Sequence, residues 1–295
     1  MGAAADTRWW VKKAARIGMA AGGRAIARAE QTVSPGPRVR VLTYHRFGDA
    51  WPRDPFCVRL DVFEQHVAYL AERGLAVSLE DVGEFAMGRR SLPDGACLIT
   101  MDDGSISMLT GALPILAKHG VRAVAYISAG LLGIDLPDLP ERFMRPDELR
   151  ELAQGMDIGS HSFEHVSVGR LSEARAKEEA RRSKQRLEEI IGAKVRSFAY
   201  PFGTHGDFSD RTDEIMREAG YDLVFHSQHG AVRPGMLRPG GPLSLPRIKV
   251  EGGEPLWSFV AATRGAMDAW RLVDRNLWRF QRVRREINAD EARPG

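Results

Sequence analysis

The feature that most constrains the fold is a regular alternation of short, apolar strand-like segments with longer helix-like segments. The strand-like segments are rich in β-branched and aromatic residues and are bounded by turn residues. We expect strands over residues 38–44, 75–79, 97–101, 123–128, 156–160, 195–200, 222–226 and 246–250. Helices between strands return the chain to the same edge of a sheet, so this alternation predicts parallel strands. The fold class is therefore α/β, and we interpret it as a distorted (β/α) barrel of about seven strands.

An open sheet with helices on both faces is the alternative to a barrel. Open sheets that bind nucleotides carry a Gly-rich phosphate turn after the first strand. Here the first predicted strand runs into His45 and then into an irregular loop over residues 46–57. The sequence therefore favours the barrel.

Composition divides the chain into three regions. Residues 1–37 form a basic amphipathic segment that ends in the linker Ser34-Pro35-Gly36-Pro37. Residues 38–250 hold the alternating pattern, which we expect to form one domain. Residues 251–295 form a predicted helical extension.

The two ends of the chain share a basic character. Predicted helices over residues 8–30 and 256–287 carry Lys and Arg along one side and a modest apolar component. Residues 1–40 hold eight Lys and Arg against two acids, whereas the whole chain has a net charge of +3. Such helices either pack on the domain, which we favour, or contact an anionic membrane surface. No nucleic-acid motif is present in the body of the chain, so we expect no nucleic-acid partner.

The sequence contains no apolar run long enough to cross a bilayer and no clear signal peptide. We therefore expect a cytoplasmic protein, or one peripheral to the inner membrane face, in preference to a secreted one. The two cysteines, Cys57 and Cys97, are far apart in the sequence and do not support a disulfide framework.

Two adjacent carboxylates end one of the predicted strands, in Ile99-Thr100-Met101-Asp102-Asp103-Gly104. A turn at the end of a strand relaxes the alternation of side chains, so both carboxylates can reach one pocket. Two negative charges this close are costly unless a metal or another cation neutralises one of them. An ordinary Asp-Gly turn is the simpler interpretation of this segment alone.

A second motif, His161-Ser162-Phe163-Glu164-His165, places two imidazoles four residues apart. On a helical turn these side chains share one face, and they can bind one divalent ion together. The spacing alone is a weak signal. With one carboxylate added it gives a two-His, one-carboxylate set that leaves positions open for water and substrate. A second carboxylate could then accept a proton from water, and His45 could protonate a leaving amine.

The polar residues of interest lie at or just past predicted strands, as His45, Asp102 with Asp103, His161, Tyr200 and Arg247 all do. In parallel α/β barrels the carboxyl ends of the strands meet at one mouth, where the chemistry takes place. We therefore expect these side chains to gather at that mouth.

The motifs also resemble a known family. The runs Thr100–Gly104, His161–His165 and Phe198–Gly203, in this order, resemble polysaccharide deacetylases of the NodB homology type, carbohydrate esterase family 4. Leu42-Thr43-Tyr44-His45 and Leu245-Pro246-Arg247-Ile248 resemble the poly-N-acetylglucosamine deacetylase branch most. The resemblance covers about residues 38–250 and implies a NodB-type (β/α) barrel.

The resemblance also implies roles for individual residues. Asp102 would be the general base, whereas Asp103, His161 and His165 would hold a divalent metal, usually zinc. The substrate and its oxyanion would be held near Tyr200, Pro201 and Phe202, with a backbone N–H near Phe202 as donor.

This sequence departs from the family pattern at two points. Many members carry an Arg at the position of Ala199, so we expect Arg247 to supply the cation beside Asp102, with Arg196 as the second choice. Many members also carry a Leu-x-His acid near the C-terminus, which is absent here. His45 is then the expected acid, with His226 and His229 as further candidates, and we interpret Lys249 as structural or solvent-facing.

These observations predict a metal-dependent hydrolase that removes N-acetyl groups from the amino sugars of an exopolysaccharide or cell-wall glycan. One alternative keeps the site but acts on a lipid-linked sugar at the cytoplasmic membrane face, as a deacetylase or deformylase. The other alternative is a carbohydrate-binding pseudoenzyme, which the presence of both carboxylates and both histidines disfavours.

Overall fold

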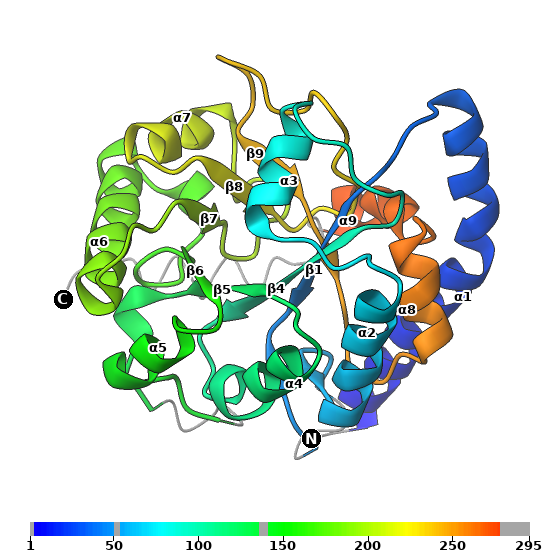
Figure 1. Ribbon diagram of the computed structural model, residues 1–295, viewed down its shortest axis with the longest axis horizontal. Helices are drawn as coiled ribbons and strands as arrows, with labels where there is room; N and C mark the ends of the chain where they lie inside the picture. The colour runs from blue at the N-terminus through cyan, green and yellow to red at the C-terminus, as the bar shows by residue number, and fades with distance from the viewer. Residues whose placement is uncertain (1–2, 50–53, 136–140, 278–295) are drawn as a thin grey trace.

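The centre of the molecule is a parallel sheet that curls into a nearly closed barrel (Figure 1). The computed structural model describes residues 3–49, 54–135 and 141–277, with only the backbone described for 3–8 and 275–277. The sheet has eight strands in the order β10-β1-β4-β5-β6-β7-β8-β9. Their bounds are β1 Arg40–Tyr44, β4 Cys97–Asp103, β5 Ala123–Ile127, β6 Asp157–Ser160, β7 Ser197–Ala199, β8 Leu223–His226, β9 Ser244–Pro246 and β10 Ile248–Lys249.

One extended run of chain joins the two edges of this sheet. β9 pairs with β8 and β10 pairs with β1, and only Arg247 separates β9 from β10. Residues 244–249 therefore fill the gap between β8 and β1 as a single interrupted strand, which nearly closes the barrel. The predicted (β/α) barrel of about seven strands is confirmed.

Side chains of the strands alternate between the barrel interior and the surrounding helices, as a two-residue period requires. Val41, Leu98 and Val124 belong to an interior cluster that α3 (Leu79–Ala86) covers. Their neighbours Leu42 and Ile99 belong to the larger cluster under the outer helices. Both faces of the strands are buried, which explains why the strands are almost continuously apolar.

The outer layer consists of helices that alternate with the strands (Figure 1). Their bounds are α2 Leu60–Glu72, α4 Leu113–Lys118, α5 Pro146–Leu152, α6 Glu173–Ile191 and α7 Asp210–Glu218. The long helix α6 begins at the N-cap Ser172 and ends at Gly192, whose φ of 68° is the left-handed conformation that favours glycine.

Two details of the predicted fold are wrong. Residues 75–79 form no strand: Ala76 makes one isolated bridge to Cys97, and Ser78 caps the start of α3 through a capping box with Asp81. A strong helix start therefore overrides a short apolar run. The small pair of strands β2 Arg46–Phe47 and β3 Cys57–Val58 lies in the segment predicted to be irregular.

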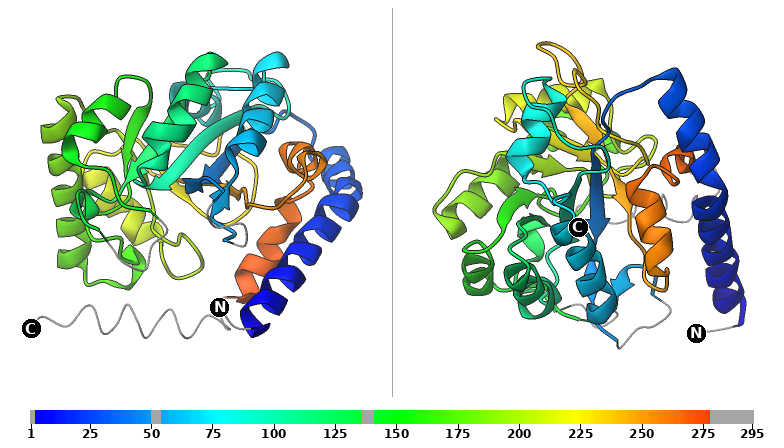
Figure 2. Two further views of the ribbon diagram at one scale, coloured as in Figure 1. Left: turned by 90° about the horizontal axis from the view of Figure 1, so that it is seen from below. Right: turned by 45° about the vertical axis from the view of Figure 1, so that its right-hand side comes forward.

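The N-terminal helix α1 (Ala3–Val33) packs along α8 (Leu256–Thr263) at the side of the barrel (Figure 2). Its basic residues are not all on the outside, because Lys13 and Arg16 are buried against Glu251 and Glu254. The expected single basic side of this helix is therefore wrong, although packing on the domain is observed.

The C-terminal extension is broken rather than continuous. After α8 the chain turns at Gly265 and continues as a short 3-10 segment, Asp268–Trp270, and as α9 (Arg271–Leu277). The rest of the predicted helix, from residue 278 onwards, lies outside the described residues. The division of the chain at residues 37 and 250 stays a prediction. Within the described part of the chain, no helix is both long and apolar enough to cross a membrane.

Candidate metal and catalytic site

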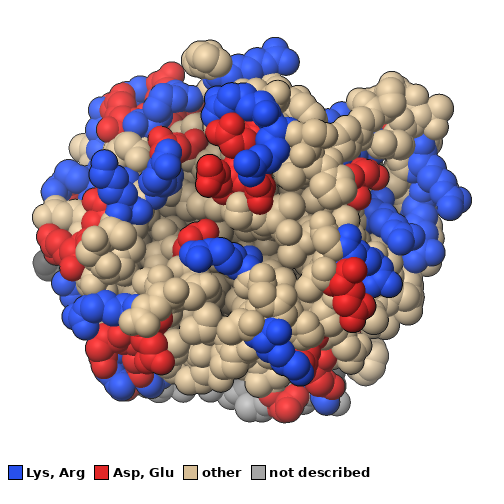
Figure 3. All heavy atoms as spheres, viewed as in Figure 1, with Lys and Arg blue, Asp and Glu red and all other residues tan. Residues whose placement is uncertain are grey.

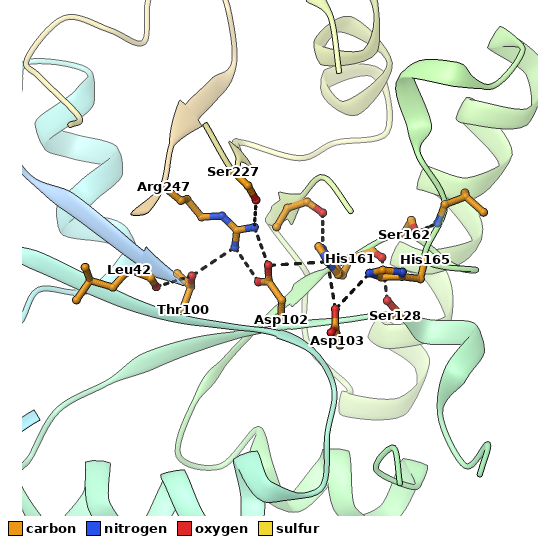
Figure 4. A network of polar contacts seen from close by, with 12 residues as sticks. Leu42, Thr100, Asp102, Asp103, Ser128, His161, Ser162, His165, Ser227 and Arg247 are labelled. Atoms are coloured by element: carbon orange, nitrogen blue, oxygen red, sulfur yellow. Dashed lines mark hydrogen bonds and ion pairs between the residues drawn. The ribbon is translucent and has the colours of Figure 1, made fainter. Parts of the chain in front are cut away.

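Asp102 lies inside the barrel mouth in a bidentate ion pair with Arg247. The alternation along β4 points Leu98, Thr100 and Asp102 to the interior. The two guanidinium nitrogens Nη1 and Nη2 of Arg247 donate to the two carboxylate oxygens of Asp102, each at 2.7 Å (Figure 4). Both side chains are almost completely buried. Arg247 therefore neutralises Asp102, as expected, whereas Arg196 pairs with Asp222 at the surface.

Asp103 would point away from the mouth if the strand stayed regular. Its φ of 82° breaks the alternation at the last position of β4. Its Oδ1 atom then lies 3.5 Å from Nε2 of His161 and 3.3 Å from Nε2 of His165 (Figure 4). The structure thus brings together the three residues that the sequence singled out as metal ligands.

His161 is oriented by its other ring nitrogen. Nδ1 lies 2.7 Å from the carbonyl oxygen of Ala199. A carbonyl only accepts, so Nδ1 carries the hydrogen and Nε2 presents a lone pair toward Asp103. Ala199, which stands where many members of the resembled family carry Arg, therefore contributes through its backbone.

His165 reaches the site from an irregular loop and not from the expected helical turn. Ser162 and His165 both have positive φ values, of 62° and 58°. The fully buried carboxylate of Glu179, on α6, accepts hydrogen bonds from the backbone N–H groups of Phe163 and Glu164 at 2.8 and 3.0 Å. Glu179, which the sequence did not point to, thus fixes the shape of this loop.

Strained backbone is concentrated at this site. Among the described residues, the non-glycine residues with positive φ are Asp103, Ser162, His165 and Phe202. Such conformations persist where the surrounding structure enforces them, often at functional sites. All four lie in or next to the Asp-His-His cluster, so the fold tolerates backbone strain in order to position the cluster.

The donor set fits a divalent metal ion. The carboxylate oxygen of Asp103 and the two imidazole nitrogens all lie within 4.8 Å of one another. Two ligands bound tetrahedrally to one ion at about 2.1 Å are about 3.4 Å apart, close to the oxygen–nitrogen distances observed here. Two neutral imidazoles and one carboxylate are also the ligand types that zinc accepts.

Burial and neighbouring groups set the ionisation of these side chains. Burial opposes the charge of Asp102, but the Arg247 guanidinium outweighs it and lowers the pKa of Asp102. Asp103 is partly buried, which opposes its charge, yet its contacts with His165 hold its pKa well below the ordinary value. Burial lowers the pKa of His161 to about 4. At neutral pH the site therefore holds two carboxylates and a neutral His161, as metal binding requires.

The cluster opens into two adjoining cavities. One has a volume of about 280 Å³ and is lined by His45, Phe56, Phe202, Ser227 and Lys249 together with the Asp and His residues. The other, of about 220 Å³, shares Asp103 and His165 with the first and continues to Leu131 and Phe143. Lys249 therefore faces the cavity, contrary to its interpretation as structural or solvent-facing.

His45 lies against Phe56 at the wall of this cavity, with ring centroids 4.8 Å apart. Its Nδ1 atom is buried and has no hydrogen-bond partner among the described residues. Burial lowers the pKa of His45, and the charges of Asp103 and Asp102 oppose that shift. The other two candidate acids do not line the cavity: His226 stacks on Phe208, and His229 pairs with Asp274 at 2.8 Å.

The third motif contributes one of its three predicted residues to the cavity. The Phe202 ring packs edge-on against His165, with centroids 5.0 Å apart. Tyr200 turns away: its hydroxyl donates to Asp213 and its backbone N–H donates to Phe225. Neither Tyr200 nor Pro201 lines the cavity, because Tyr200 continues the buried strand pattern and packs in the core.

The turn of this motif depends on Gly203. Its φ is 57°, and a Cβ atom there would lie 2.6 Å from the backbone nitrogen of Ser227. Ser227 in turn lies 3.4 Å from Arg247 through its hydroxyl. The glycine therefore allows the close approach that joins the Phe202 turn to the Asp102–Arg247 pair.

A larger groove of about 520 Å³ lies at the other end of the barrel. α3 and the beginnings of β6 and β8 line it, and ion pairs such as Arg122–Asp157 stand at its rim. Figure 3 shows a hollow on this face, with charged side chains of both signs around it. No histidine or cysteine lines the groove. It therefore lacks the imidazole ligands that the cluster at the mouth provides.

Comparison with known proteins shows which family this chain resembles. Residues 89–224 match the family model described as polysaccharide deacetylase. Among curated proteins, YxkH of Bacillus subtilis is 23% identical over 218 residues, which cover 73% of this chain and 72% of that protein. Poly-beta-1,6-N-acetyl-D-glucosamine N-deacetylase of Escherichia coli K12 is 24% identical over 259 residues. That match covers 74% of this chain and 37% of the enzyme.

Solved structures show the same fold. IcaB from Ammonifex degensii superposes with a TM-score of 0.65 at 26% identity, covering 78% of this chain and 98% of that one. The Streptococcus pyogenes deacetylase PplD superposes with a TM-score of 0.66 at 22% identity, covering 78% and 99%.

The barrel fold and the matched sequence model define a hydrolase of the deacetylase class. Residues 89–224, just under half of the chain, match the polysaccharide deacetylase family, as the sequence motifs predicted. Members of this family act on N-acetylated glycans, and the family generally depends on a metal ion, for which this chain offers Asp103, His161 and His165.

Proposed function

We propose that this protein removes N-acetyl groups from the amino sugars of an exopolysaccharide or cell-wall glycan. The observation that carries the proposal is the buried Asp102–Arg247 pair directly beside the Asp103-His161-His165 cluster. One carboxylate is available for proton transfer and the other for metal binding. The likeness to a poly-N-acetylglucosamine deacetylase supports the choice of substrate class.

Asp103, His161 and His165 would hold the metal, most simply Zn²⁺. A divalent metal of this kind polarises a carbonyl and lowers the pKa of water, so that water attacks at neutral pH. The site geometry favours neutral imidazoles as ligands, because Ala199 fixes the proton of His161 on Nδ1.

Asp102 is the general base in this proposal. Its carboxylate is kept ionised by Arg247 and lies 3.9 Å from His161, at the edge of the metal cluster. It accepts a proton from the attacking water, while Arg247 holds both of its oxygens in place. Arg247 thereby acts on the reaction through Asp102 rather than on the substrate.

His45 is the proposed acid. It lines the same cavity, and although burial lowers its pKa, the charges of Asp103 and Asp102 favour its protonated form, which is the form that donates. It gives a proton to the amine nitrogen as the carbon–nitrogen bond breaks, so that acetate and a free amino sugar leave. The turn at Phe202 closes the cavity beside His165, where the oxyanion of the intermediate would form.

A lipid-linked amino sugar at the cytoplasmic membrane face is the second candidate substrate. The second cavity favours it, because apolar Leu131 and Phe143 continue the mouth beyond the metal cluster. A carbohydrate-binding pseudoenzyme is the third candidate, and the intact set of carboxylates and histidines speaks against it.

The decisive experiment is acetate release from a panel of polymeric and lipid-linked acetamido sugars, measured with and without a chelator. A deacetylase releases acetate and stops when the metal is removed. The panel also separates the first two substrates. Hydrolysis of a chromogenic acetyl ester that chelation does not affect would contradict the metal-dependent mechanism, and binding of glycans without any release of acetate would indicate a pseudoenzyme.

A further inference from the structure

Exposed aromatic and aliphatic side chains gather where the beginnings of α1 and α8 meet. The exposed fraction is 60% for Trp10, 65% for Val11 and 43% for Trp257. Trp9 packs edge-on against Trp10 with ring centroids 4.6 Å apart, and its ring also contacts Gly253, just before α8. We call Trp9, Trp10, Val11, Leu256 and Trp257 the tryptophan patch.

The tryptophan patch lies beside the mouth of the active site. The segment that leads from β10 into α8 begins at Lys249, which lines the catalytic cavity. Gly252 in this segment donates a backbone hydrogen bond of 3.1 Å to Pro55, next to the cavity residue Phe56. Only a few residues therefore separate the patch from the cavity, both along the segment from Lys249 to α8 and across the Gly252–Pro55 hydrogen bond. Figure 2 shows the first turns of α1 and α8 at this same end of the molecule.

The surface of α1 that continues from the patch is positively charged. Arg24 and Arg28 are exposed on it, Lys12 is half-exposed and pairs with Glu251 at 2.7 Å, and no acidic residue occurs between Asp6 and Glu30. The acids of the neighbouring segment, Glu251 and Glu254, are buried against Lys13 and Arg16. In Figure 3, Lys and Arg side chains lie along the edge of the molecule where α1 runs.

Most of the remaining exposed positions between the patch and the last turns of α1 are small, with Ile26 as the exception. The small ones are Ala14, Ala15, Gly18, Ala21, Gly22, Ala25 and Ala29. Small side chains allow a flat surface to approach the helix closely along its length. A helix that presents tryptophans near one end and exposed cations, with no acid between Asp6 and Glu30, has the properties of a segment that lies in a lipid interface.

We propose that the tryptophan patch and the cations of α1 dock this protein on an anionic phospholipid surface, with the active-site mouth next to the lipid. A second copy of the chain is the less favourable occupant. A two-fold contact through α1 would place cations opposite cations, because both partners present the same patch. An anionic bilayer instead complements the charge and accepts the tryptophans at the headgroup level.

This docking goes beyond the proposed deacetylation and does not depend on it. It does bear on the substrate, because a mouth held at the lipid favours sugars that are attached to the membrane. Binding to lipid and turnover of a soluble ester are measured separately, so the failure of one proposal is distinguishable from the failure of the other.

The test is co-sedimentation of the full-length protein with vesicles of phosphatidylcholine alone and of phosphatidylcholine mixed with phosphatidylglycerol. We expect binding to the mixed vesicles, weakened by salt. The double variant Trp10→Ala/Trp257→Ala should lower vesicle affinity at least about tenfold, since both tryptophans are exposed and their loss does not disturb the core. Arg24→Gln/Arg28→Gln should lower it about fivefold for each charge. The matched control is Met236→Ala, which removes an exposed apolar side chain on the β8–β9 connection.

Three results would overturn the proposal. The wild-type protein could show no preference for anionic vesicles. The tryptophan double variant could bind them as tightly as the wild type and the Met236→Ala control. Finally, a dimer that dissociates on the Trp10→Ala/Trp257→Ala change would show that a second copy, and not lipid, covers the patch. Turnover of a soluble chromogenic ester reports that each variant is folded.

Discussion

Replacing Arg247 by Gln tests the pair on which the site is built. Arg247 and Asp102 are both almost completely buried, and two hydrogen bonds of 2.7 Å join them. Gln removes the charge and at least one of these bonds, and it leaves the buried carboxylate of Asp102 without its counter-charge. Breaking a buried pair by removing one partner typically costs about 3–5 kcal/mol. We expect Arg247→Gln to lower the free energy of unfolding by an amount in this range.

The matched control is Arg196→Gln, which breaks another Arg–Asp pair. Arg196 contacts Asp222 at 2.6 Å, but 72% of the Arg side chain and 53% of the Asp side chain are exposed. Water and salt screen such a pair, so its loss should cost about 1 kcal/mol or less. The two variants make the same chemical change and differ chiefly in burial.

The assay is urea unfolding of the full-length chain, with turnover of an acetyl ester measured in parallel. The variant Asp102→Asn and the double variant Asp102→Asn/Arg247→Gln complete a thermodynamic cycle. Because the double variant leaves no unpaired charge, we expect it to be more stable than the sum of the two single losses predicts, by about 2 kcal/mol. If Arg247→Gln cost no more stability than Arg196→Gln, or if the cycle showed no coupling, the account of a buried, mutually dependent pair would be refuted.

Two further predictions concern groups around the site. Glu179→Gln weakens the two hydrogen bonds that hold the histidine loop, so we expect it to lower the free energy of unfolding by about 1–3 kcal/mol and to weaken metal binding. The control Glu178→Gln, on the outer side of the same helix, should change neither. Equal metal affinity in both variants, measured by competition with a chelator, would contradict this role. Burial lowers the pKa of His66 to about 3, so between that value and about 6.5 only the unfolded chain takes up the proton and stability falls as the pH falls. The stability advantage of the wild type over His66→Gln should therefore shrink by about 2 kcal/mol from pH 7 to pH 5, as urea unfolding at both pH values would show; a constant difference would mean that His66 is not held neutral in the fold.

The sequence placed best the residues that are set by strand position. Asp102 occupies an interior position near the end of β4, and two-residue alternation makes such a position readable from the sequence. Residue type and spacing suggested two histidines and one carboxylate as ligands, and the family resemblance singled out Asp103 as that carboxylate. Tyr200 was predicted to line the substrate site because it belongs to the third motif. Its side chain instead continues the alternation of β7 and packs in the core.

Other features depend on contacts between distant segments and give no local signal. The histidine loop takes its shape from Glu179, which is one of many acids in a charged helix and differs only in being buried. Nothing in the sequence indicates that Arg16 pairs with Glu251 and Glu254, which lie on a segment more than two hundred residues away and help to bury it. The strand over 75–79 was predicted from its apolar residues alone, although Ser78 and Asp81 together carry the signature of a helix start.

The most direct test of the central claim compares metal content and turnover in the purified wild-type, Asp102→Asn and His161→Ala proteins. Metal content is measured by inductively coupled plasma mass spectrometry after removal of loosely bound ions, and turnover by acetate release. We predict that the wild type and Asp102→Asn both retain a tightly bound divalent ion but that only the wild type turns over, whereas His161→Ala loses the ion and the activity together. Full metal content and full activity in both variants would contradict the assignment of one acid to proton transfer and of the Asp-His-His cluster to the metal.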